Sequence, residues 1–136
     1  MCKGMKNKAK GSNAERELLL MFSKEGYGVS RVAGSGSSQL PTPDIIACKK
    51  GKCIAIECKT KSGKYLNIRP EQVEELRTWE GLAEFPAYVA WGLGKDKWYF
   101  ISHKDLNKTK KAYSIKKEEI MEKGLDFHGF LNLMTH

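Results

Sequence analysis

The strongest constraint on the fold of this chain is a pair of short apolar runs, residues 44–48 and 53–59, joined by Lys-Lys-Gly-Lys. Two runs of strand length around a short loop that contains Gly predict an antiparallel β-hairpin. With a four-residue loop, Asp44 lies directly opposite Glu57. Side chains alternate between the faces of a strand, so Asp44, Glu57 and Lys59 share one face. The two acidic Cβ atoms are then expected to lie about 5 Å apart.

The opposite face of the predicted hairpin is apolar, and we expect it to face the core. It carries Ile45, Ala47, Ile54, Ile56 and Cys58. Periodicity and turn residues predict the elements around it. We expect helices at residues 13–25 and 68–83, and strands at residues 27–32, 87–92 and 97–102. The order predicts an α/β fold with a small mixed β-sheet flanked by helices. Residues 1–136 suit a single domain with one core.

The N-terminal segment is strongly basic, with four lysines within residues 3–10 and no acid among them. We interpret residues 1–11 as a flexible arm that contacts phosphates. Ser12 and Glu15 have the spacing of a capping box, which predicts that the first helix begins directly after Ser12.

Three further segments are less regular. Residues 33–43 are rich in Gly, Ser and Pro and are either a linker or a mobile functional loop; the acids that follow favour function. Residues 104–117 are read as a Lys-rich connection. Residues 125–134 form an apolar C-terminal segment.

The balance of charge indicates the kind of partner. Lys and Arg total 24 against 16 acids, which gives a net charge of +8 and a pI near 9.3. An excess of this size favours a polyanionic partner over an inert basic surface. The sequence has no apolar run of membrane-spanning length and no secretory signal at its N-terminus. We therefore expect a cytoplasmic protein that does not bind membranes.

The four cysteines do not have the spacing of a zinc site, because none of them form a CxxC pair. Cys48, Cys53 and Cys58 lie inside apolar runs. We expect them to be buried free thiols in a reducing compartment.

The predicted acidic face carries the chemistry. Facing carboxylates repel and destabilise a sheet, unless a hard divalent cation such as Mg²⁺ binds between them. A bound metal lowers the pKa of a water molecule and stabilises charge on a phosphoryl oxygen. Lys59 would orient the attacking water or neutralise the phosphorane. These residue types suit phosphodiester hydrolysis. The alternative is a surface hairpin with a solvated Glu57–Lys59 pair and Asp44 as a turn residue.

The segment from Pro43-Asp44 to Glu57-Cys58-Lys59 resembles the PD-(D/E)xK nuclease signature. Several surrounding segments resemble archaeal Holliday junction resolvases of the Hjc type, in order and with similar gaps. They are residues 10–18, 28–37, 43–47, 56–59 and 69–72. The resemblance covers about residues 8–102 and implies a nuclease core like that of restriction endonucleases.

The resemblance also implies a set of functional residues. The catalytic residues would be Glu15, Ser35, Asp44, Glu57 and Lys59. The metal, Mg²⁺ with Mn²⁺ as a substitute, would be held by Glu15, Asp44, Glu57 and the carbonyl of residue 58. Ser35 would approach the scissile phosphate from its loop. The residues expected to contact DNA are Lys8, Lys10, Arg16, Arg31, Ser35, Lys61, Arg69 and Gln72. The alternative for Arg16 and Arg31 is a surface salt bridge, and the alternative for Gln72 is a role in ordering the site.

The activity implied is resolution of four-way DNA junctions by a homodimer, in recombination and repair. An intracellular, nucleoid-associated location would follow. The apolar C-terminal residues would supply dimer contacts or pack on their own core. They are Leu125, Phe127, Phe130, Leu131 and Met134. Two alternatives stay open: another PD-(D/E)xK repair or restriction endonuclease, and a non-catalytic basic DNA-binding module.

Overall fold

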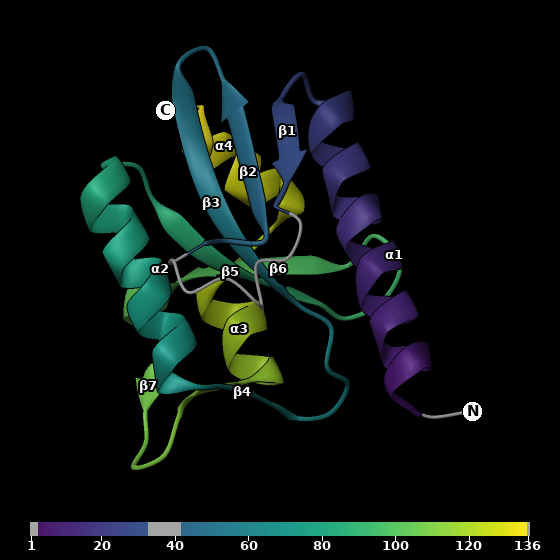
Figure 1. Ribbon diagram of the computed structural model, residues 1–136, viewed down its shortest axis with the longest axis vertical. Helices are drawn as coiled ribbons and strands as arrows, with labels where there is room; N and C mark the ends of the chain where they lie inside the picture. Colours follow the sequence, from purple (N-terminus) through teal and green to yellow (C-terminus); the bar gives the residue numbers. More distant parts are fainter. Residues whose placement is uncertain (1–2, 33–41, 136) are drawn as a thin grey trace.

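A six-stranded mixed sheet forms the centre of the molecule (Figure 1). The structure is a computed structural model that describes residues 3–32 and 42–135, with residues 3–12 by their backbone only. The strands, in spatial order, are β1 (Gly28–Arg31), β2 (Ile45–Lys49), β3 (Lys52–Lys59), β5 (Ala87–Gly92), β6 (Trp98–Ser102) and β9 (Leu125–Asp126). Strands β3 and β5 are parallel, and the other neighbouring pairs in this sheet are antiparallel. The expected small mixed sheet is confirmed.

Helices cover both faces of this sheet, and a second sheet of three strands packs beside it. The helices are α1 (Lys3–Lys24), α2 (Pro70–Ala83), α3 (Lys117–Lys123) and α4 (Phe127–Met134), with a short 3₁₀ helix η2 (His103–Asp105). The second sheet has the order β4 (Tyr65–Ile68), β8 (Tyr113–Lys116) and β7 (Asn107–Lys108).

The core is divided by the large sheet into two layers. Helices α1 and α2 lie on opposite sides of the sheet (Figure 1). On the α2 side, Val73 and Leu76 pack with Val89 and Trp91 of β5. Residues of the second sheet complete that layer: Leu66, Ile68, Tyr113 and Ile115. On the α1 side, the buried cluster includes Leu18, Phe22, Ile45, Ile56, Trp98, Phe100, Phe127 and Phe130. Strand β3 is buried on both faces, because Ala55 packs in the α2-side layer and Ile54 and Ile56 pack in the α1-side layer, and this fixes the position of the hairpin.

The register of this hairpin is the predicted one. Cys48 pairs with Cys53, and Ile45 pairs with Ile56, so the next position places Asp44 beside Glu57. The turn is tighter than expected, because Lys49 and Lys52 also pair and only two residues remain in the loop. Lys50 and Gly51 both have positive φ, of 51° and 81°. This conformation matches a two-residue type I′ turn, whose twist suits a hairpin. The apolar face of the hairpin lies in the α1-side layer, as expected.

Helix α1 begins much earlier than the capping box predicted. It starts at Lys3, so Ser12 lies inside the helix and the predicted start after Ser12 is wrong. The expected flexible arm is helical from Lys3 onward. Lys, Met and Ala are good helix formers and no Pro interrupts the segment, so the helix can propagate through it. Glu15 is consequently a mid-helix residue and not a capping residue.

The Lys-rich connection at residues 104–117 contains structure that the composition concealed. It supplies β7 and β8, where Tyr113 and Ile115 alternate inward. Strand β4 was not predicted at all. The C-terminal segment forms β9 and α4 and packs on its own core, since Phe127 and Phe130 are buried there.

Other boundaries agree closely with the sequence patterns. The predicted helix at residues 68–83 is α2, with Pro70 at its first position and a left-handed Glu84 after its end. Strands β1, β5 and β6 lie within the predicted ranges. Most of the Gly/Ser/Pro loop, residues 33–41, lies outside the described residues. No helix in the described part of the chain is long and apolar enough to cross a membrane.

The expectation of three free thiols is wrong for two of them. The hairpin register places Cys48 opposite Cys53, and the two form a disulfide. The predicted register already places these two cysteines opposite each other, and the expectation of free thiols rested on a reducing compartment. Cys58 is a free cysteine, as expected.

Phe130 tests whether α4 belongs to the core. Its ring is fully buried and stacks on Phe100 with centroids 4.2 Å apart. We expect Phe130→Ala to lower the free energy of unfolding by about 3–5 kcal/mol. Leu133→Ala, on the exposed side of the same helix, should cost roughly 0.5 kcal/mol or less. Urea denaturation of both variants checks this; equal small losses would contradict the assignment of α4 to the core.

Candidate active site

Two carboxyl groups meet at the end of the hairpin that is remote from its turn. Asp44 directly precedes β2, and Glu57 lies near the end of β3. The side chains of these two acids are hydrogen-bonded to each other. The backbone N–H of Cys58 also donates to Asp44 Oδ2 at 2.9 Å, which ties the aspartate to the neighbouring strand. The structure therefore brings together the acid pair that strand alternation predicted.

The electrostatics of the pair depend mainly on burial. The side chain of Glu57 is only 12% exposed. Burial, followed by repulsion from Asp44, raises the pKa of Glu57 to about 8, and Lys59 opposes this shift. Without a bound cation, Glu57 is therefore mostly protonated at neutral pH. Two carboxyl groups in contact do not both stay ionised unless a cation compensates their charge.

Lys59 completes the face and is held by two partners. Its Nζ lies 3.6 Å from Glu57 Oε2 and donates to Gln72 Oε1 at 3.0 Å. Gln72 is in the first turn of α2, where Pro70 and the extended backbone of Arg69 set the start of the helix. Gln72 and Glu57 together position the ammonium group of Lys59. We predicted that Gln72 either contacts DNA or orders the site; in the structure its side-chain amide oxygen accepts the hydrogen bond from Lys59, which fits the second role.

Glu15 approaches the pair from α1. Its Oε2 accepts a hydrogen bond of 2.6 Å from Arg31 Nε, at the end of β1. Burial and the nearby charge of Asp44 raise the pKa of Glu15, while Arg31 lowers it. Glu15 is thus close enough to Asp44 for electrostatic coupling, and its carboxylate is directed to an arginine.

The donor chemistry of the pair fits a divalent cation. Two carboxylate groups within hydrogen-bonding reach are the hard oxygen ligands that such ions prefer. Within the described ranges, no three His, Cys, Asp or Glu side chains gather closely enough to hold a metal. Of the three metal ligands expected from the resemblance, Asp44 and Glu57 are together, whereas Glu15 is paired with Arg31.

The other predicted DNA contacts are less closely grouped. Arg16, Lys61 and Arg69 are exposed, on α1, after β3 and before α2. Ser35 lies outside the described residues. Lys8 and Lys10 belong to the backbone of α1, but their side chains also lie outside what the structure describes.

Several contacts could not be found from the sequence. The Lys59–Gln72 contact joins a strand to a helix, and the Arg31–Glu15 pair joins two other elements. The indole N–H of Trp91 donates to the carbonyl oxygen of Lys61 at 2.7 Å and fixes the chain just beyond Lys59. No local spacing encodes such contacts. The only available signal was the co-occurrence of these residues in the segments that resemble Hjc proteins.

A mixed sheet that carries an acid pair and a lysine at the end of one hairpin defines a nuclease core of the PD-(D/E)xK class. Residues 6–136 match the family model described as archaeal Holliday junction resolvase (Hjc). The chain belongs to this family.

Curated relatives and solved structures agree. The crossover junction endodeoxyribonuclease Hjc of Archaeoglobus fulgidus is 38% identical over 119 residues, which cover 88% of this chain and 87% of the relative. The enzyme of the same name from Sulfolobus acidocaldarius is 32% identical over 125 residues, 90% of this chain and 87% of the relative. The structure of Archaeoglobus fulgidus Hjc, a Holliday junction resolvase, superposes with a TM-score of 0.81 at 34% identity, covering 90% of this chain and 98% of that one.

A more distant likeness concerns the fold alone. A bacterial homing endonuclease superposes with a TM-score of 0.62 at 16% identity, covering 94% of this chain and 93% of that one. The two proteins share an architecture.

The raised pKa of Glu57 predicts how stability depends on pH without metal. Below pH 4.5 Glu57 is protonated in both the folded and the unfolded chain, so its contribution to the free energy of unfolding is fully present there. Between pH 4.5 and about 8 the unfolded chain loses the proton and the folded chain keeps it, so rising pH favours unfolding. Glu57→Gln should remove this loss, because the amide stays neutral.

The measurement is the thermal unfolding midpoint from pH 4 to pH 9 in a chelator. The parent should lose more stability than Glu57→Gln across this range. Glu75→Gln, the same change at an exposed position of α2, should follow the parent. Parallel curves for the parent and Glu57→Gln would show that the carboxyl pair does not hold the proton.

Proposed function

We propose that this chain is a structure-selective endonuclease that resolves four-way DNA junctions by paired phosphodiester hydrolysis. The observation that carries the proposal is the contact between the Asp44 and Glu57 carboxyl groups beside Lys59 Nζ. A binding module has no need of a buried acid pair on a basic protein. The family supports the choice of substrate, since its relatives are named for crossover junctions.

The roles follow from the positions of the groups. Nucleases of the Hjc family depend on a metal ion, and we assign Mg²⁺, with Mn²⁺ as a substitute, to Asp44 and Glu57. When bound, this ion supplies charge against a phosphoryl oxygen and lowers the pKa of water. Cys58, whose backbone N–H holds Asp44, keeps that carboxylate oriented. Lys59 places its ammonium group, oriented by Gln72, where negative charge develops on the phosphate.

Glu15 and Arg31 form a second, movable part of the site. Arg31 is partly exposed and carries a positive charge at the edge of the acid cluster. In our proposal a DNA phosphate competes with Glu15 for Arg31, which leaves the Glu15 carboxylate available to join Asp44 and Glu57. Arg16, Lys61 and Arg69 then contact neighbouring phosphates, as do Lys8 and Lys10 of α1. Ser35 approaches the scissile phosphate.

Paired cleavage requires two active sites on one junction, so we propose that the chain acts as a homodimer. Of the C-terminal apolar residues, Phe127 and Phe130 are buried within their own chain, so we assign these two to the core and not to the dimer interface. The proposal places the enzyme inside the cell, with the nucleoid.

Substitution of the three central residues tests the proposal. Asp44→Asn and Glu57→Gln remove one anionic ligand each at constant size. We expect both to abolish cleavage and to keep junction binding, because the acid pair holds the cation whereas the basic residues bind the DNA. Lys59→Ala should slow cleavage roughly 10²–10³-fold. The measurement is single-turnover cleavage of a labelled four-way junction with Mg²⁺, beside gel-shift affinity at one salt concentration.

The controls separate the alternatives. Glu75→Gln repeats the chemical change of Glu57→Gln on an exposed helical surface and should cut like the parent. A duplex of the same sequence should resist cleavage, which distinguishes a resolvase from another PD-(D/E)xK endonuclease. Mixing parent with Glu57→Gln subunits should give singly nicked junctions, as a dimer with one active site would. If the three central variants cut at the parent rate, the assignment of the active site is wrong.

A further inference from the structure

A groove of about 640 Å³ lies beyond the end of the strand that carries Glu57 and Lys59, and among its described lining residues Lys61 alone has a role in the mechanism above. It is found where the parallel strands β3 and β5 end, between α1, the segment after β3 and the β5–β6 turn. Figure 1 shows the β3–β4 connection and the β5–β6 turn on the side of α1. The first residue of α3, Lys117, also lines it.

Chain continuity connects this groove to the catalytic residues. Ala14, which lines the groove, directly precedes Glu15. Thr60, another lining residue, directly follows Lys59. Lys61 is one residue further, at most about 7 Å along the chain from Lys59. A polymer whose scissile bond lies at Asp44 and Glu57 would therefore extend over the groove.

The charge of the groove matches a polyanion. Lys61, Lys95 and Lys117 line it from three different segments, and all three are exposed. Of the described residues that line it, Glu17 is the one acid, and its Oε1 accepts a hydrogen bond from the backbone N–H of Asp96. Asn13, Thr60 and Ser62 add neutral hydrogen-bonding groups. Lysines together with hydroxyl and amide groups are the usual contacts to DNA phosphates.

The walls of the groove are held by hydrogen bonds between elements. The Trp91 indole fixes the carbonyl of Lys61 at 2.7 Å. The backbone N–H of Lys117 donates to the carbonyl of Lys64 at 2.8 Å, which ties α3 to the segment before β4. Glu17 ties α1 to the β5–β6 turn at 2.5 Å. The three lysine-bearing segments are therefore placed before any ligand binds, which lowers the entropic cost of binding.

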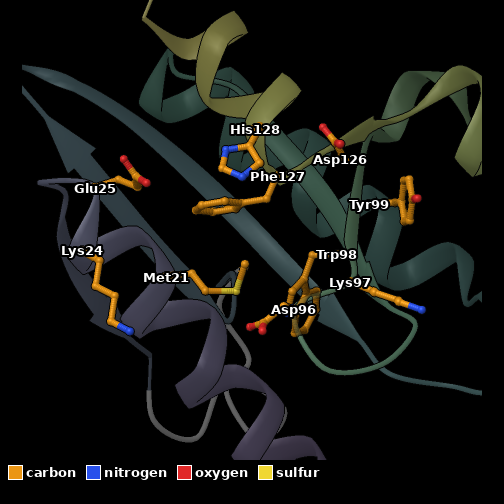
Figure 2. A pocket seen from close by; sticks show the side chains of 10 residues that line it. All are labelled: Met21, Lys24, Glu25, Asp96, Lys97, Trp98, Tyr99, Asp126, Phe127 and His128. Carbon is orange, nitrogen blue, oxygen red and sulfur yellow. The ribbon is translucent and has the colours of Figure 1, made fainter.

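A second pocket, on the other side of Trp98, differs in charge (Figure 2). It has a volume of about 370 Å³ and lies between α1, the β5–β6 turn and α4. Its lysines, Lys24 and Lys97, are outnumbered by acids. These acids are Glu25, Asp96 and Asp126. Phosphate binding is favoured in the groove beside the acid pair and not in this pocket.

We propose that the groove binds the sugar-phosphate backbone of the DNA arm that adjoins the scissile phosphate. Lys95 and Lys117 are the new contacts, and they continue the line of positive charge that starts at Lys59 and Lys61. The inference rests on the proposed function, since it assumes that DNA is cleaved at the acid pair. It assigns binding of the arm to the α1 side of the β3 and β5 ends.

The test is the salt dependence of junction binding. Lys95→Gln combined with Lys117→Gln removes two phosphate contacts. The slope of log affinity against log salt concentration should become shallower by about 2. The affinity gap between parent and variant should then narrow roughly tenfold between 50 and 200 mM salt. Gel-shift titrations at four salt concentrations measure both quantities on a labelled four-way junction.

Two further variants make the result specific. Lys110→Gln with Lys111→Gln removes the same charge from the exposed β7–β8 turn and should keep the slope of the parent. Lys95→Arg with Lys117→Arg keeps the charge and should also bind with the parent slope. Thermal unfolding midpoints verify that every variant is folded. If the arginine variant also has a shallower slope of log affinity against log salt concentration, the effect comes from altered packing and the proposal is wrong.

The outcomes distinguish the groove from the active site. If the parent cleaves junctions and the double glutamine variant keeps the full slope, the groove does not bind DNA, while the proposed function stands. If the parent shows no salt-dependent junction binding, both are wrong. Ethylation of phosphates on one arm of the junction should weaken binding by the parent. At the same positions it should not affect binding by the double glutamine variant. If ethylation weakens binding equally in both proteins, the proposal is also overturned.

Discussion

The packing of the β2–β3 hairpin is the constraint on which the contact between the Asp44 and Glu57 carboxyl groups depends. Two like charges on facing strand positions destabilise a hairpin, and burial increases the cost. The hairpin tolerates them because it is packed on both faces of a six-stranded sheet, by α1 and α4 on one side and α2 on the other. Its apolar residues hold the acids in register, whether or not a cation is bound. Folding energy from the core thus maintains a site that is locally unfavourable.

Several neighbouring elements contribute side chains that surround this acid pair. Helix α2 supplies Gln72 to Lys59, and α1 supplies Glu15, which is held by Arg31. The parallel pairing of β3 with β5 places Trp91 beside Lys59. The Trp91 indole then fixes the segment that follows Lys59, through the carbonyl oxygen of Lys61. The basic groove then begins where these strands end. The candidate catalytic residues and the proposed DNA-binding groove are adjacent because both lie at the ends of β3 and β5.

The sequence predicted the parts of the site that depend on local periodicity. Alternation along two short strands was enough to place Asp44, Glu57 and Lys59 on one face, and the helix predicted at residues 68–83 is α2. The capping-box spacing at Ser12 was misleading, because a helix that starts at Lys3 can pass through such a sequence. The Lys-rich composition of residues 104–117 did not indicate strands β7 and β8, in which the buried residues Tyr113 and Ile115 alternate with more exposed polar residues. The Arg31–Glu15 pair and the lysine groove join distant segments, and no local pattern records them.

In our proposal, a divalent cation binds to Asp44 and Glu57 and displaces the proton from Glu57. Mg²⁺ titration calorimetry at pH 7, in buffers of different ionisation enthalpy, measures the protons released on binding. Because the pKa of Glu57 is about 8, close to one proton should be released at pH 7, and much less at pH 9. Glu57→Gln should release none and bind the ion weakly. Tight Mg²⁺ binding by the parent without proton release, or the same release by Glu57→Gln, would contradict the account.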